Sequence, residues 1–316
     1  MFVLHRIIKS PFANRIMLIS PLFLKQLDAL SLGARRAFTG SSRGEKRSLK
    51  RGASVEFADF RPYHLGDDIR RIDWNAYGRV EKLYLKQFLE EEDLDLTLVL
   101  DASASMGFGE PSKFLVAQQI AAAIGYVALN GFDRVGGVAF DSDARAWFPP
   151  SRGRVAPARL MKFLESQRAQ NQGDFILAAQ RVATRAQRSG VAVVMSDFLF
   201  AEQSATAQNG ARGYEAGLKT LAARGFEVSV LQILDADELA PNFMGDFKLV
   251  DAEDASTREV TMGATMLSTY KRRAQTYCDE LRAFCLRYNM NYALITNDTP
   301  IETTMLRVVR GMGLVK

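Results

Sequence analysis

The sequence is poor in the residues from which nucleophilic and zinc sites are usually built. Its 316 residues contain two histidines, His5 and His64, and two cysteines, Cys278 and Cys285. Neither the histidine base of a serine hydrolase nor the closely spaced ligands of a zinc site can be identified. The cysteines lie seven residues apart in a helical pattern, on one face but two turns apart, which excludes a disulfide between them. We therefore expect buried, reduced thiols and a reducing, cytoplasmic location.

Long apolar runs are also missing. No stretch reaches the roughly 18 residues that a membrane-spanning helix needs, so we expect no transmembrane segment. The apolar N-terminal segment MFVLHRIIKSPFANRIMLISPLF is interrupted by charged residues and prolines, and it lacks the features of a signal peptide. This segment is expected to pack on the protein itself. The alternative is peripheral membrane contact through an amphipathic helix.

The net charge is modest, at +5, but positive charge is concentrated in residues 35–51. The stretch TGSSRGEKRSLKRG within it is typical of an exposed linker. A solvated linker is the simpler interpretation, and binding to nucleic acid, anionic lipid or an acidic partner is the alternative. Aromatic residues are not interleaved with the cations, so nothing indicates base stacking.

From residue 94 onward, expected strands alternate with expected helices. The runs LTLVL, VAVVM and FEVSVLQIL are apolar throughout, as strands buried on both faces are. Helices are predicted near residues 112–130, 156–168, 175–188, 214–224 and 266–288, and from residue 300 onward. The pattern predicts an α/β fold with a mostly parallel sheet covered by helices on both faces. Upstream, we expect a helical arm and basic linker at 1–52 and two short strands around a charged, loop-rich segment at 53–93.

The stretch LTLVLDASASMGFG contains the candidate site. Asp101 ends a buried strand, Ser103 and Ser105 follow at alternate positions, and Asp197 ends the later run VAVVMSD. Ligands of open α/β sheets bind at the carboxyl ends of the strands, and a buried acid is costly unless it is paired or bound to a cation. One carboxylate and two hydroxyls suit Mg²⁺ or Mn²⁺. The alternative is a helix cap in a tight small-residue turn.

Several enzymes are excluded by the motifs that are absent. A haloacid-dehalogenase-type phosphatase needs a second aspartate where Ser103 stands. Neither a G-x-S-x-G elbow nor a phosphate-binding P-loop appears.

The DASAS motif followed by SDF resembles the metal-ion-dependent adhesion site of von Willebrand factor A domains. The resemblance implies that Asp101, Ser103, Ser105 and, directly or through water, Asp197 hold a divalent ion: Mg²⁺, or else Mn²⁺ or Ca²⁺. The threonine of that family is expected within NQGDF, but Gly173 stands in its place with Asp174 beside it. Asp174 then completes the ligand set, or the site is weaker or lost.

The upstream run FADFRPYHLGDDIRRIDW is similar to the signature of the DUF58 family, which precedes a von Willebrand A-like domain. The resemblance implies a non-enzymatic, metal-dependent protein-interaction module that works with a MoxR-type AAA+ ATPase in chaperone-like complex assembly or maturation. No small-molecule substrate is implied. The residues leave two alternatives open, namely a metal-dependent phosphohydrolase or nuclease and a scaffold with a vestigial metal site. In the signature itself, we expect salt bridges among the charged residues at 67–73 and a buried Trp74.

Overall fold

A computed structural model describes residues 18–33, 56–64, 67, 69–89, 94–200, 213–241, 245–250 and 257–316. The chain divides into two compact units, one formed by Met1–Arg36 with Leu94–Lys316 and the other by Ala37–Asp93. The basic stretch at 35–51 and the first seventeen residues of the expected helical arm lie outside the described residues.

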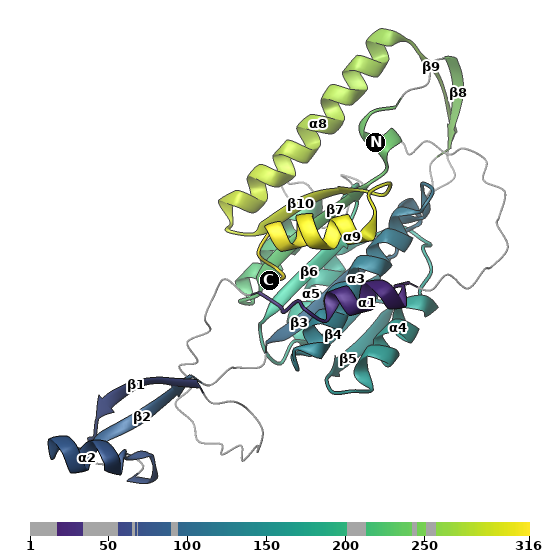
Figure 1. The fold of residues 1–316 in the computed structure, drawn as a ribbon. Coiled ribbons are helices and arrows are strands. Elements are labelled where there is room, and N and C mark those ends of the chain that lie inside the picture. The colour runs from purple at the N-terminus through teal and green to yellow at the C-terminus, as the bar shows by residue number, and fades with distance from the viewer. Residues whose placement is uncertain are drawn as a thin grey trace. The chain divides into compact units, whose positions relative to one another are not determined.

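The larger unit is built on a six-stranded sheet in the order β10-β7-β6-β3-β4-β5 (Figure 1). All neighbouring strands pair in parallel except β4 and β5, which are antiparallel. The strands are β3 (Asp95–Asp101), β4 (Arg134–Phe140), β5 (Ala146–Ser151), β6 (Val191–Ser196), β7 (Glu227–Leu234) and β10 (Asn291–Thr296). From β3 the chain first adds β4 and β5 on one side and then β6, β7 and β10 on the other. The strand order therefore reverses between β3 and β6, where α/β sheets bind their ligands.

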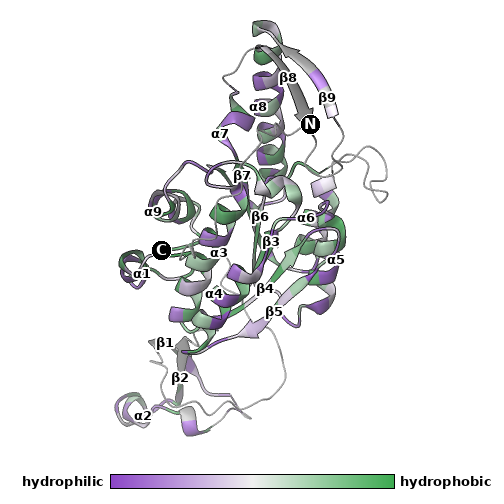
Figure 2. Cartoon of the chain, turned by 90° about the vertical axis from the view of Figure 1, so that its right-hand side faces the viewer, coloured by the Kyte–Doolittle hydropathy of each residue, from purple (hydrophilic) through white to green (hydrophobic). Residues whose placement is uncertain are grey.

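Helices cover both faces of this sheet, and each face has its own hydrophobic core. The first core joins the sheet to α1 (Pro21–Leu27), α3 (Lys113–Asn130), α4 (Ala156–Ser166) and the C-terminal α9 (Ile301–Thr303) with the helical turn η4 (Thr304–Val309). The second core joins it to α5 (Phe175–Arg185), α6 (Gly213–Ala223) and α8 (Ala264–Arg287). Figure 2 shows the hydrophobic colour on the central strands and hydrophilic patches on the covering helices. The predicted α/β fold is confirmed.

The ends of the larger unit are held by direct contacts. Leu32 forms a β-bridge with Val315, and the Tyr126 hydroxyl donates to Asp28 at 2.7 Å, so the described part of the N-terminal arm packs on this unit. A separate hairpin consists of β8 (Gly245–Val250) and β9 (Thr257–Met262). Within the described part of the chain, no helix is both long enough and apolar enough to cross a membrane.

The smaller unit contains the two predicted strands, β1 (Glu56–Pro62) and β2 (Tyr84–Leu89), which pair in an antiparallel hairpin. Between them lie a 3-10 turn, η1 (Ile69–Arg71), and a short helix, α2 (Trp74–Val80), which the sequence pattern did not predict. The Asp73 carboxylate starts this helix by accepting the N–H groups of Asn75 and Ala76 at 2.9 and 3.2 Å. This cap explains why a helix forms here, although its seven residues are too few to show an apolar periodicity.

The charged residues of the signature include one well-formed ion pair. Both Asp67 oxygens accept from the Arg61 guanidinium at 2.8 Å, and one of them also accepts the backbone N–H of His64. These hydrogen bonds, that from Arg61 first, lower the pKa of Asp67 to about 2. Asp67 is therefore paired with Arg61, which lies outside the residues 67–73 among which salt bridges were expected. The expectation of a buried Trp74 is wrong: the side chain is 63% exposed and packs edge-to-face on Tyr77, because it opens a helix that buries none of its residues.

Candidate functional site

The DASAS segment lies where β3 ends and turns into a 3-10 helix, η2 (Ala104–Gly107). Asp101 is the last residue of β3, and its Oδ1 accepts the backbone N–H of Ser103 at 2.9 Å. The hydroxyls of Ser103 and Ser105 are hydrogen-bonded to each other at 3.1 Å. All three side chains are buried. The loop therefore turns inward and is held by its own polar groups.

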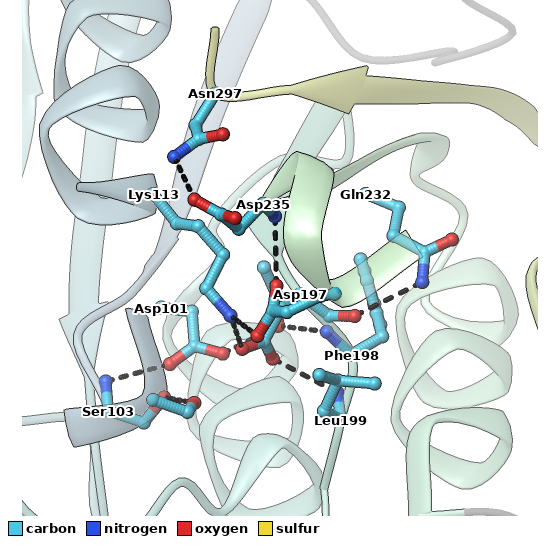
Figure 3. A network of polar contacts seen from close by, with 12 residues as sticks. Asp101, Ser103, Lys113, Asp197, Phe198, Leu199, Gln232, Asp235 and Asn297 are labelled. Atoms are coloured by element: carbon cyan, nitrogen blue, oxygen red, sulfur yellow. Dashed lines mark hydrogen bonds and ion pairs between the residues drawn. The ribbon is translucent and has the colours of Figure 1, made fainter. Parts of the chain in front are cut away.

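Asp197 follows the last residue of β6, the strand beside β3. The two strand ends are joined directly, because the Ser196 hydroxyl donates to Asp101 Oδ2 at 2.5 Å. Asp197 Oδ1 accepts the N–H of Leu199 at 3.0 Å, and both aspartates point into the same space (Figure 3). Asp101, Ser103, Ser105 and Asp197 thus gather at the switch point of the sheet, as strand-end reasoning expects.

Asp174 has a different use. It is the N-cap of α5, where its Oδ1 accepts the N–H of Leu177 at 2.9 Å. The neighbouring Gly173 leaves little room for a larger residue, since an added Cβ would lie 3.1 Å from a Phe200 ring carbon and 3.2 Å from Ser103 Cβ. A threonine could enter only if these neighbours moved. The segment around Gly173 and Asp174, where von Willebrand factor A domains are expected to supply a threonine ligand, here caps α5 and packs against Phe200.

Lys113 is the residue that sequence reasoning missed. It is the first residue of α3 and is completely buried, and its Nζ lies 2.7 Å from Asp197 Oδ2 and 2.7 Å from Glu238 Oε1. Figure 3 shows the side chain extending toward Asp197, with Asp101 beside it. The only signal in the sequence was a charged residue opening a helix whose body, VAQQIAAAIGYVAL, is almost entirely apolar.

Glu238 belongs to the short helix α7 (Ala236–Leu239), which follows β7. Its second oxygen accepts the backbone N–H of Asp235 at 2.9 Å and forms part of a capping box. Asp235 accepts from Asn297 Nδ2 at 2.6 Å, and the same amide donates to the Pro111 carbonyl at 2.7 Å. The polar network therefore links the ends of β3, β6, β7 and β10 to the loop between Asp101 and Lys113.

Gly109 permits this packing of the loop against the strand ends. Its φ of +93° is a conformation that glycine adopts readily. An added Cβ would lie 2.2 Å from Asn297 Nδ2 and 2.3 Å from Asp235 Oδ2. No other residue fits without breaking the contact between the loop and the ends of β7 and β10.

The charges of the network determine its protonation. Burial alone would lower the pKa of Lys113, but the carboxylates of Asp197 and Glu238 raise it above its usual value, so the ammonium stays charged. Burial raises the pKa of Glu238. Burial, and then the charge of Asp197, raise the pKa of Asp101 to about 7. The buried ammonium thus lies between two acids, Asp197 and Glu238, while the third acid, Asp101, is partly protonated near neutral pH.

As arranged, these residues do not fit a divalent ion. Asp197 already faces an ammonium at 2.7 Å, which occupies space a metal would need. Among the described residues, no group of three or more His, Cys, Asp or Glu side chains has a metal-binding arrangement, although serine hydroxyls do not enter that comparison. In the same part of the chain, every buried side-chain nitrogen and oxygen has a hydrogen-bond partner, whereas an open ligand set would leave oxygens without one. Asp197 and Glu238 are paired with Lys113, and Asp101 accepts from Ser103 and Ser196.

Of the histidines and cysteines, the structure describes His64, Cys278 and Cys285. His64 lies in the smaller unit, where its ring nitrogen is 3.3 Å from Arg61. Both cysteines are buried, and burial raises the pKa of Cys278 to about 11 and that of Cys285 to about 12. Such thiols are protonated and unreactive at neutral pH, as the sequence led us to expect.

The raised pKa of Asp101 predicts how stability depends on pH. A carboxyl whose pKa rises on folding holds its proton more tightly in the native state, so its contribution favours folding at low pH and is lost as the pH rises through about 7. We expect Asp101 to lower the free energy of unfolding between about pH 4 and pH 7, by up to about 1.4 kcal/mol per pH unit. Asp101→Asn keeps the size and removes the titration, so urea unfolding of the variant should show a flatter pH dependence. Parallel curves for the two proteins would contradict the shift.

Comparison with known proteins places the chain in a family. The model described as protein of unknown function DUF58 matches residues 59–278, which include parts of both units. The uncharacterized proteins Rv1480 of Mycobacterium tuberculosis and Mb1516 of Mycobacterium bovis are each 28% identical over 262 residues, covering 81% of this chain and 79% of their own.

Among solved structures, two Bacteroides proteins are similar to this chain. An aerotolerance-related membrane protein from Bacteroides fragilis has a TM-score of 0.43 at 18% identity, over 70% of this chain and 98% of its own. The conserved hypothetical protein BatB from Bacteroides thetaiotaomicron has a TM-score of 0.42 at 16% identity, over 69% and 98%.

Proposed function

The chain belongs to the DUF58 family, and from this premise and the geometry of the site we propose that it is a non-enzymatic protein-interaction module. Its partner is a MoxR-type AAA+ ATPase, with which it acts in chaperone-like assembly or maturation of a protein complex. The observation that carries the proposal is the satisfied polar network at the carboxyl edge of the sheet. Such a network fixes the shape of a surface, because its side chains hold one another in place.

The surface in question is the outer side of the loop between β3 and α3. Gly107, Glu110 and Pro111 are exposed, while Asp101, Ser105 and Lys113 beneath them are buried. Preorganised loops lose little conformational entropy on binding, which favours recognition by a partner. We propose that this loop is the docking surface.

The alternative of a metal-dependent phosphohydrolase or nuclease finds less support. Phosphoryl chemistry at such a site requires metal ions with positions open to substrate. Here the Asp197 carboxylate is bound to Lys113, and the candidate acids are shielded from solvent. A phosphatase and nuclease screen with Mg²⁺ and Mn²⁺ is expected to be silent, and turnover lost in Asp101→Asn would favour the enzyme.

Affinity capture from the native cell lysate in the presence of Mg²⁺ and ATP tests the proposed partnership. We expect the tagged full chain to recover a MoxR-type ATPase. Glu110→Arg reverses a charge and adds bulk on the proposed surface, and it should reduce recovery roughly tenfold, which corresponds to about 1.4 kcal/mol.

Asp279→Arg is the matched control, because it makes the same charge reversal at an exposed aspartate of α8, a different element of the fold. Its recovery should equal that of the unmodified chain. If the proteins recovered with the tagged chain include no AAA+ ATPase, the proposed partnership is contradicted. Equal losses in both variants would contradict the docking surface.

A further inference from the structure

We propose that Lys113 is a built-in cation that takes the place of a divalent metal ion, so that this site holds its shape without metal. The proposal concerns the site of the proposed function and deepens it, because it specifies how the docking loop is held. It rests on where the ammonium lies and on which groups surround it.

The ammonium of Lys113 holds acids from different segments together, as a bound metal ion would. It joins Asp197, at the end of β6, to Glu238, in the helix after β7, at 2.7 Å each. These acids lie 84 and 125 residues from Lys113 in the chain, so one ion ties three distant segments together. Because the cation is covalently attached at the start of α3, neither a chelator nor a low metal concentration can remove it.

Other positions at which a metal ligand was expected also differ from a metal site. Gly173 provides no side-chain oxygen, and one oxygen of Asp174 caps α5. The hydroxyls of Ser103 and Ser105 bond to each other. Gly173 and Asp174 thus supply no side-chain ligand, for reasons that do not depend on Lys113, whereas the carboxylates of Asp101, Asp197 and Glu238 remain beside the ammonium or the DASAS loop. The loss of ligands and the gain of an ammonium are independent observations that agree.

The buried position of Lys113 also requires that its charge be retained. Asp197 and Glu238 raise the pKa of this lysine above its usual value, against the effect of burial. Two carboxylates 2.7 Å away therefore hold this lysine as an ammonium ion. With an ammonium and not Mg²⁺ at this place, a partner's carboxylate cannot complete a metal shell here. Docking at this edge is then expected to depend on shape and to be indifferent to divalent ions.

The test is a titration of the purified full chain with Mn²⁺, followed by the electron paramagnetic resonance signal of free Mn²⁺ and by calorimetry. The unmodified protein is expected to bind no Mn²⁺ at this site up to about 1 mM, the weak end of biological divalent-ion sites. Lys113→Ala removes the ammonium and leaves space beside Asp197 and Glu238. This variant should gain a single Mn²⁺ site and should be stabilised by Mn²⁺ against heat.

Two further variants make the result specific. Lys113→Ala combined with Asp197→Asn should lose the gained site, and Lys271→Ala, a change at an exposed lysine of α8, should gain none. Saturable Mn²⁺ binding by the unmodified chain that disappears in Asp101→Asn would overturn the proposal. A folded Lys113→Ala that binds no Mn²⁺ would also overturn it.

If Lys113→Ala does not fold even with Mn²⁺, the titration of the unmodified chain decides: silence supports the proposal and Asp101-dependent binding rejects it. The titration contains no partner, so its outcome is separate from that of affinity capture. If affinity capture does not recover the ATPase, the proposed role of Lys113 is unaffected. If the unmodified chain binds Mn²⁺, the proposed partnership is unaffected.

Discussion

Replacing Lys113 with methionine is expected to lower the free energy of unfolding by about 3–5 kcal/mol, the range found when one partner of a buried ion pair is removed. Methionine fills nearly the same volume, so the loss reports charge and not a cavity. Asp197 and Glu238 would then be buried, at 1% and 4% exposure, without the ammonium that balances them. Thermal unfolding should show a melting temperature lower by roughly 10 °C.

The control and the rescue separate charge from packing. Lys271→Met, on the exposed side of α8, should change stability by no more than about 0.5 kcal/mol. Adding Asp197→Asn and Glu238→Gln to Lys113→Met should recover part of the loss, because the acids would no longer be charged and their accepting oxygens would remain for Leu199 and Asp235. If Lys113→Met is as stable as the control, the ion pairs contribute little.

The fold was predictable because its signal is local. Runs such as VAVVM, between helices with apolar faces, indicate strands buried on both sides wherever they occur. Their alternation limits the topology to an open parallel sheet. The strand order is a property of the whole chain, yet the position of Asp101 and Asp197 at strand ends was enough to bring them to one edge. Helix α2 was not predicted because it depends on the Asp73 cap, and its seven residues are too few to show a helical repeat of apolar residues.

The content of the site was only half predictable. The acids and serines could be identified because they follow buried strands, but their counter-ion could not. Lysine at a helix start is usually solvated, and only the folded chain shows that Lys113 turns inward to acids far away in sequence. The resemblance to metal-binding domains pointed to a divalent ion, whereas the structure has the Lys113 ammonium beside Asp197 and Glu238. Trp74 shows the converse, since a large apolar residue in a helix of a small unit need not be buried.

The aromatic cluster beneath the site gives the second large effect. Phe175 follows Asp174, is 1% exposed, and packs on Phe140, Phe198 and Phe200 with ring centroids 5.7–5.9 Å apart. Phe175→Ala should lower the free energy of unfolding by about 3–5 kcal/mol, since it removes a ring from a packed core and leaves a cavity. Urea unfolding measures this loss. Phe132→Ala is the matched control: that ring is 74% exposed, so a change within about 0.5 kcal/mol is expected.

A second substitution shows that the effect arises from this ring and its neighbours. Gly217 in α6 faces Phe175 so closely that an added Cβ would lie 2.6 and 2.7 Å from two ring carbons. In the unmodified protein, Gly217→Ala should therefore destabilise by about 1–3 kcal/mol, because the ring has no room to move. In the Phe175→Ala background the clash is gone, and alanine in a helix interior is favoured over glycine by about 0.5–1 kcal/mol. The sign of the Gly217→Ala effect should reverse between the two backgrounds, whereas additive effects would mean that the ring does not limit the approach of α6 to α5.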